Sequence, residues 1–176
     1  MPSPVAHAIA GLSVHLLTAR NRVDLTSVPH AVVAVAAAVA PDLDLLLRFI
    51  DGRNHHQAES HSIAVALIVG AVVALAARVA GSRRAVSLGI VAAAAWGSHL
   101  LLDYLGRDTH PPIGLPILWP FADGYFKFPW PLFLDIGRTL SWHTVRHNAL
   151  AVAWEMVLML PILLATWWWR QRRGEG

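Results

Sequence analysis

The chain has 176 residues, and 56% of them are hydrophobic against 14% charged, a balance that indicates lipid rather than water as the main surroundings. Its formal net charge is only +3 and its 14 basic residues are scattered along the chain, which argues against a nucleic-acid partner. Because cysteine is absent, disulfides, thiolate metal sites and cysteine nucleophiles are excluded, and any metal ion must be bound by His, Asp or Glu.

Five apolar runs predict five membrane-embedded helices. The first two, residues 5–17 and 26–40, are shorter than the roughly 20 residues that a helix needs to cross about 30 Å of hydrocarbon, and would span only with flanking residues or in a thinned bilayer. The other three have the full length and cover residues 62–80, 85–105 and 149–169. We therefore expect an all-α, polytopic transmembrane bundle of about five helices that forms one domain over residues 1–176. Buried helices of a soluble α domain are the alternative.

The first two runs carry the first candidate site residues. His7 is a lone histidine in the first run and is either a metal ligand or a structural residue. The second run ends at Pro41, which interrupts the helix and is followed by Asp42 and Asp44. Two carboxylates this close repel each other unless a cation neutralises them, so we predict that they bind or bridge metal ions and are the catalytic carboxylates. The alternative is that they cap a short helix.

Further histidines precede the third run. His56 and His61 lie on either side of residues 57–60 and are near enough along the chain to fold back onto Asp42. We predict both as metal ligands and interpret the adjacent His55 as a solvated neighbour.

The fourth run contains a His–Asp pair near its end. His99 and Asp103 are spaced i, i+4, so their side chains lie on one face of the helix and can bind one ion. Ionisable groups in a membrane segment are costly without a partner ion or a water-filled cavity. A neutral imidazole hydrogen-bonded to the carboxylate is the alternative.

The connection over residues 106–148 is long and rich in proline and aromatic residues. It suits an interfacial cap that lies over the metal site and admits an amphipathic substrate from the side, and it equally suits a loop that only packs on the helix ends. Further candidate ligands in this connection and the last run are His110, His143, His147 and Glu155. Arg53 and Arg146 are candidate phosphate contacts, although binding to lipid headgroups explains them equally well.

Basic residues predict the orientation. Placing the turn at residues 78–84 and the tail at residues 170–173 in the cytoplasm satisfies the positive-inside rule and brings Arg20 and Arg22 to the same side. Most of the histidines and carboxylates then lie at the outer ends of the helices. We therefore expect a multi-pass protein of the cell (inner) membrane with its metal site on the extracytoplasmic side.

Several short motifs follow one another in order. They are Pro41-Asp42-Leu43-Asp44, His56-x-x-x-x-His61-Ser62, His99-Leu100-Leu101-Leu102-Asp103 and Leu115-Pro116-Ile117-Leu118-Trp119-Pro120-Phe121. Together with His7 they resemble the YdjM-like, LexA-regulated, membrane-bound metal-dependent hydrolases of bacteria, over residues 7–121. Gln57 and Ala58 depart from the Arg and Gly that are usual in that family, which leaves the ligands intact but puts an anion contact in doubt.

The order of these residues is also similar to the zinc-dependent phospholipase C and nuclease group, which is α-helical and binds several zinc ions. In that comparison His110 and the pair His143/His147 fall near further ligand positions, although the pair lacks the carboxylate that the group has at i+4. The resemblance implies phosphoester hydrolysis, whereas spacing alone indicates only metal binding.

The expected mechanism uses two or three divalent ions, zinc or manganese in view of the purely nitrogen and oxygen ligands. A metal-activated water would attack the phosphoester of a lipid-like substrate at headgroup depth. One ion would be bound by His61, His99 and Asp103, with Asp42 or Asp44 bridging to a second supported by His7, His56 or His110. The alternatives are a non-enzymatic metal- or proton-handling membrane protein and a purely structural metal site.

Overall fold

The computed structural model describes residues 1–19, 22–47, 50, 52, 57–109 and 111–173, and within them it confirms the all-α prediction. Five long helices are present in this part of the chain, joined by a one-turn helix, two 3-10 helices and one long loop. The α-helices are α1 (Pro4–Thr18), α2 (Arg22–Leu25), α3 (Val28–Val39), α5 (Ile63–Val79), α6 (Ala85–Leu105) and α7 (Trp142–Arg173). The 3-10 helices are η1 (Ala40–Leu47) and η2 (Glu59–His61).

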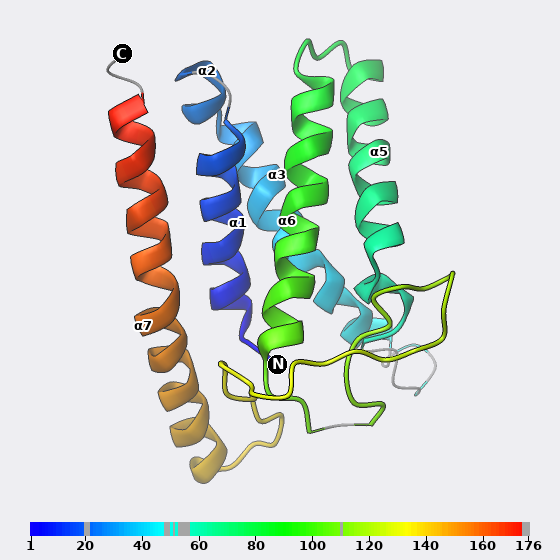
Figure 1. The fold of residues 1–176 in the computed structure, drawn as a ribbon, viewed down its shortest axis with the longest axis vertical. Coiled ribbons are helices and arrows are strands. Elements are labelled where there is room, and N and C mark those ends of the chain that lie inside the picture. The colour runs from blue at the N-terminus through cyan, green and yellow to red at the C-terminus, as the bar shows by residue number, and fades with distance from the viewer. Residues whose placement is uncertain (20–21, 48–49, 51, 53–56, 110, 174–176) are drawn as a thin grey trace.

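The five long helices stand side by side and run alternately up and down (Figure 1). α6 packs against α1, α3 and α5, whereas α7 packs on the outside against α1. As a result, the start of α1, the end of η1, the start of α5 and the end of α6 meet at one end of the bundle. The Arg-bearing turn between α5 and α6 lies at the opposite end.

Three helical stretches are long and apolar enough to cross a membrane, namely Val28–Leu46, Ala85–Leu105 and Trp142–Arg172. The second run is longer than its apolar residues indicated, because η1 continues directly from α3 and Pro41 occupies the first turn of the new helix, where its missing N–H is tolerated. The last helix also begins earlier than residue 149, at Trp142, since the Ser141 side chain accepts a hydrogen bond from the N–H of Thr144 at 3.1 Å. Pro4–Thr18 and Ile63–Val79 are the shorter apolar helices.

Small residues bring the helices close together. A Cβ added at Gly89 would lie 2.6 Å from the carbonyl oxygen of Gly70, so the α5–α6 contact requires glycine at that position. Where α3 meets α6, the core is formed by four buried alanines, Ala37, Ala38, Ala92 and Ala95. Backbones in close contact through small side chains are typical of helix packing in lipid, where apolar burial supplies no driving force between helices.

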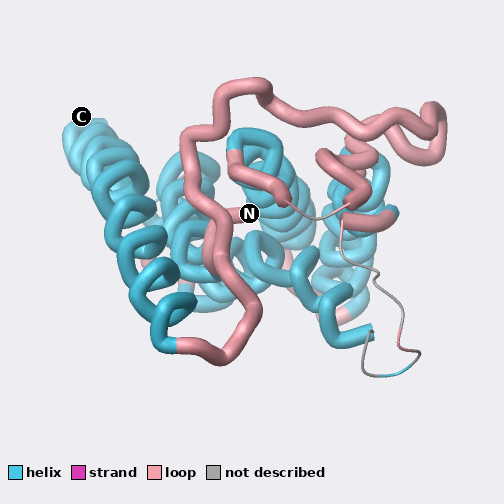
Figure 2. The backbone as a smooth tube through the Cα atoms, turned by 90° about the horizontal axis from the view of Figure 1, so that it is seen from below, coloured by secondary structure: helices cyan, strands magenta, loops and turns pink. Residues whose placement is uncertain are grey.

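The loop over residues 106–141 lies across the lower ends of the helices (Figure 2). Leu115 and Phe126 exchange backbone hydrogen bonds of 2.9 Å, and the N–H of Ile63 donates to the carbonyl of Ile117 at 3.0 Å. Leu115 is fully buried. The loop is therefore attached to the start of α5, and it closes the end of the bundle at which the candidate site residues gather.

Candidate metal centre

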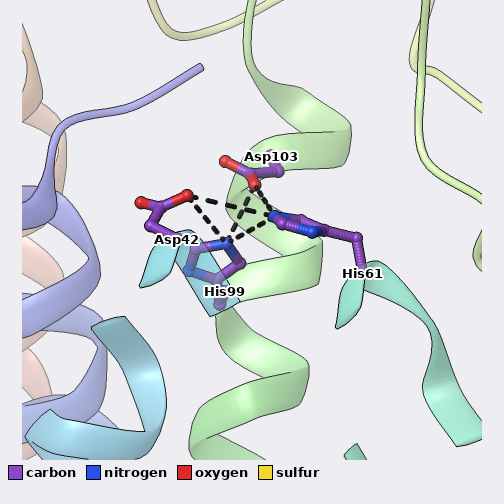
Figure 3. A group of neighbouring side chains, drawn as sticks. All are labelled: Asp42, His61, His99 and Asp103. Carbon is purple, nitrogen blue, oxygen red and sulfur yellow. Dashed lines mark hydrogen bonds and ion pairs between the residues drawn. The ribbon is translucent and has the colours of Figure 1, made fainter. Parts of the chain in front are cut away.

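Four side chains converge at the lower end of the bundle: Asp42 from η1, His61 from η2, and His99 and Asp103 from α6 (Figure 3). One ligand atom from each lies within 4.8 Å of the other three. His61, His99 and Asp103 are buried, and Asp42 is partly exposed. Residues that are far apart in the sequence, such as Asp42 and Asp103, are thus brought to one point where these elements meet.

The distances between these atoms match those expected around a metal ion. For zinc bonds of about 2.1 Å in a tetrahedral site, two ligand atoms lie roughly 3.4 Å apart. Nε2 of His99 lies 3.0 Å from Asp103 Oδ2, 3.2 Å from Nε2 of His61 and 3.7 Å from Asp42 Oδ1. Nε2 of His61 lies 3.4 Å from Asp103 Oδ2 and 3.9 Å from Asp42 Oδ1. Two imidazoles and two carboxylates therefore fit one divalent ion.

The hydrogen bonds on the outer ring nitrogens support the same conclusion. Nδ1 of His99 lies 2.8 Å from the carbonyl of Ala38, which can only accept, so this nitrogen carries the proton. Nδ1 of His61 lies 2.9 Å from the Ser60 hydroxyl and 3.3 Å from the carboxylate of Asp44, to which Ser60 donates at 2.8 Å. In the neutral tautomers assigned from this network, both Nε2 atoms are lone-pair acceptors that face each other and need a cation between them.

Electrostatics independently favour positive charge at His61. Burial alone lowers the pKa of its imidazole, but the neighbouring carboxylates of Asp103 and Asp44 outweigh burial and raise the pKa to about 9. The protein thus favours positive charge at this position, and a metal ion would have to displace a proton from it.

His7, on α1, lies beside the four residues of the cluster. Its ring is fully buried and stacks on His99 with 3.9 Å between centroids. Its Nε2 lies 3.4 Å from Asp103 Oδ1, the oxygen that faces away from the other ligands, and neither ring nitrogen has a hydrogen-bond partner in the described structure. A fully buried imidazole without a hydrogen-bond partner costs free energy of folding, so the position of His7 is that expected of a group that binds a ligand.

Comparison with known proteins gives the family. The model of the YdjM inner membrane protein family matches residues 1–173. The chain belongs to the YdjM family. No curated protein and no solved structure matches it.

The two predicted catalytic carboxylates of this YdjM protein occupy different positions. Asp42 faces Nε2 of His61 and His99, inside the four-residue cluster. Asp44 instead contacts Nδ1 of His61 and the Ser60 hydroxyl, on the side of the ring that points away from the cluster. A carboxylate in that position orients a ligand histidine rather than holding the ion directly.

Replacing Asp44 by Asn is therefore expected to weaken zinc binding by roughly 10- to 100-fold without abolishing it, because His61 keeps its place but loses an anionic partner. Competition with a chromogenic chelator measures this affinity. Asp123→Asn, which alters an exposed acid in the loop, serves as the control and should bind as the native protein does. Complete loss of the ion in Asp44→Asn would make Asp44 a direct ligand.

The candidates on the last helix lie outside the four-residue cluster. His143, Arg146 and His147 line a surface pocket at the start of α7, and Nε2 of His147 lies 2.8 Å from the carbonyl of Asp135 in the loop. Glu155 is fully buried and accepts a 2.7 Å hydrogen bond from the N–H of Ser3, as well as one from the Ser3 hydroxyl. Its carboxyl group thus accepts from both the N–H and the hydroxyl of Ser3, the residue directly before α1. The predicted His56, His110 and Arg53 lie outside the described residues.

Two features of the site had no signal in the spacing of histidines and acids. The carbonyl of Ala38 is a backbone group, and any residue in that place would supply it. Ser60 is adjacent to His61 in sequence, and its carbonyl also accepts a 2.9 Å hydrogen bond from Trp96 Nε1, which fixes η2 against α6. A polar residue directly before a predicted ligand histidine is the signal that could have identified Ser60.

Proposed function

We propose that this YdjM protein is a membrane-bound, metal-dependent hydrolase that cleaves a phosphoester in a lipid-like substrate. The observation that carries the proposal is the four-residue cluster, in which two lone-pair nitrogens and two carboxylates converge at tetrahedral spacing. A structural metal site would account for the cluster as well, but it would not account for a pocket that opens onto one of the ligands.

The donor set of two imidazoles and two carboxylates suits zinc, with manganese as the second choice. An ion held there would supply Lewis acidity and lower the pKa of a water toward neutrality. His61, His99 and Asp103 Oδ2 would hold the ion, and Asp42 would complete its shell on the side of the pocket. His7 and the second oxygen of Asp103, whose Nε2 and Oδ1 lie 3.4 Å apart, would be the residues available to hold a second ion.

The pocket supports a substrate with an apolar part. It has a volume of about 370 Å³ and is lined by Asp42, by apolar residues of α3 and η1, and by the loop residues 108, 109, 135, 136 and 138. Sites that are mostly apolar with a few polar groups at one end are typical of small amphipathic ligands. The cluster lies at the end of the bundle opposite to Arg78 and Arg84, which under the positive-inside rule supports an extracytoplasmic position for it.

The test is hydrolysis by the purified protein in detergent micelles, with a panel of phosphomonoester and phosphodiester lipids. We expect turnover of at least one class, its loss after treatment with chelator, and its recovery with stoichiometric zinc or manganese. A protein that binds the ion stoichiometrically and hydrolyses none of the panel would instead be the non-enzymatic metal-handling protein that the sequence also allows.

A further inference from the structure

A buried glutamine in the same pocket has no role in the metal cluster. Gln57 precedes η2, is only 3% exposed and lines the pocket together with Asp42. Its side-chain Nε2 donates to no acceptor in the described structure. A buried amide donor left without a partner is costly, and in native proteins it indicates a ligand or water that the group is placed to meet.

The backbone of Gln57 indicates functional rather than structural selection. Its φ is +62°, in the left-handed region that favours glycine, and it is the one non-glycine residue with positive φ among those described. Folding alone would favour glycine in this position. Strained residues of this kind cluster where a side chain is needed for binding or catalysis, so the cost of the conformation is consistent with a use for the amide group.

Arg138 is a further donor on this pocket, beside the N-terminal ammonium of Met1, which donates to the carbonyl of Arg107. The charged side chains that line it are Asp42, Asp108, Asp135 and Arg138. Asp42 belongs to the cluster, Asp108 accepts from the N–H of Gly114 at 2.9 Å, and Asp135 lies 3.6 Å from His147. Arg138 is exposed and makes no hydrogen bond or ion pair with the rest of the described chain.

Apolar residues of η1 line the pocket and are also exposed on the outside of the protein. Leu43 and Leu46 line the pocket while remaining 58% and 55% exposed, so this apolar surface extends from the pocket onto the lateral face of the bundle. A cavity of about 370 Å³ holds a headgroup and the first part of a chain, and the remainder of the chain can leave along this face.

We infer that Gln57 and Arg138 form the phosphate-binding subsite of this pocket, and that its ligand is a lipid phosphate whose acyl chain lies along Leu43 and Leu46. This inference rests on the proposed function for the place of the phosphoester next to Asp42, and it adds the residues that recognise it. The Gln57 amide donates to a phosphate oxygen beside the cluster, and the Arg138 guanidinium binds the same group from the rim.

The decisive variant is Gln57→Gly, because it removes the donor and relieves the backbone at the same time. A phosphonate analogue of a monoacylglycerol phosphate, which has no phosphoester bond to hydrolyse, is titrated by calorimetry into the zinc-loaded protein in detergent micelles. We expect roughly tenfold weaker binding or more, with a melting temperature equal to or above that of the native protein. Gln57→Glu, which replaces the donor by a carboxylate of the same size, should weaken binding further. Unchanged binding by Gln57→Gly would overturn the assignment of Gln57.

Arg138→Ala tests the rim, with Arg107→Ala as a matched exposed arginine outside the pocket lining. We expect Arg138→Ala to weaken binding of the lipid phosphate by roughly tenfold. Arg138→Lys should recover part of this loss, and Arg107→Ala should cause none. Neutral monoacylglycerol should bind equally to the native protein and to the three variants. Inorganic phosphate should bind to the native protein far more weakly than the lipid phosphate does. Equal effects of the two alanine variants, or inorganic phosphate that binds as tightly as the lipid, would overturn the subsite.

These results are distinguishable from failure of the proposed function. Binding that depends on Gln57 and Arg138 without any turnover would contradict the hydrolase proposal and leave the subsite intact. Turnover that neither residue affects would contradict the subsite and leave the hydrolase proposal intact.

Discussion

Purified His99→Ala protein is expected to lose its tightly bound divalent ion and all metal-dependent hydrolysis. His99 provides the shortest distance to Asp103 in the cluster and the Nε2 lone pair that faces His61, so its removal leaves two carboxylates facing each other with one imidazole. The loss of affinity for the ion should exceed the roughly 10- to 100-fold expected when a ligand histidine only loses its hydrogen-bonded carboxylate, as in Asp44→Asn. Elemental analysis after gel filtration, followed by zinc competition, measures both stoichiometry and affinity.

His143→Ala is the matched control, since His143 lies on the surface pocket of α7 and outside the cluster. It should retain the native metal content. Because His99→Ala also removes a ring that stacks on His7, Asp103→Asn is measured beside it as a variant of unchanged size. Native metal content in both His99→Ala and Asp103→Asn would exclude the four-residue cluster as the metal site.

Part of the four-residue cluster can be predicted from the helical periodicity of the sequence. The i, i+4 spacing of His99 and Asp103 placed both on one face of a helix, and a regular helix over Ala85–Leu105 makes that placement reliable. Local geometry of this kind depends on a few neighbouring residues, so the sequence alone is sufficient to predict it. Pro41 predicts an interruption of the helix before Asp42, whereas the chain continues directly as the 3-10 helix η1 with Asp42 in its first turn.

The division of roles between Asp42 and Asp44 could not be predicted in this way. The two acids are two residues apart, so in a 3-10 helix with three residues per turn they point in different directions. Whether that segment is an irregular turn, an α-helix or a 3-10 helix decides which acid faces the ion, and it depends on packing against α6 and η2. The same applies to Gln57, which is buried where residues of α3, η1 and the long loop line one pocket.

Glu155 is the clearest case in which tertiary structure overrides a sequence pattern. Its position eight residues beyond His147, on a similar face of the same helix, makes it a candidate ligand in the sequence. The structure places it against α1, where it accepts from the backbone and the side chain of Ser3. An acceptor at the first N–H groups of a helix also interacts favourably with the positive end of the helix dipole.

Replacing Glu155 by Ala is therefore expected to destabilise the protein by roughly 3 kcal/mol, because the N–H and hydroxyl of Ser3 lose their buried acceptor and a cavity is left between α1 and α7. Thermal unfolding in detergent, followed by helical circular dichroism, measures the change. Glu155→Gln keeps one acceptor oxygen and should fall between Glu155→Ala and the native protein. Gln171→Ala, at an exposed position of the same helix, is the control and should unfold as the native protein does.

The metal content of Glu155→Ala separates this structural role from ligation. All four residues of the cluster lie on η1, η2 and α6, so the ion they hold should remain bound when α1 loosens. His7 lies one turn after Ser3 on α1, so only a second ion held by His7 should bind more weakly. A Glu155→Ala protein that loses every bound ion but still unfolds at the native temperature would instead identify Glu155 as a ligand. If the carboxyl group only holds α1 against α7, its removal must lower the unfolding temperature.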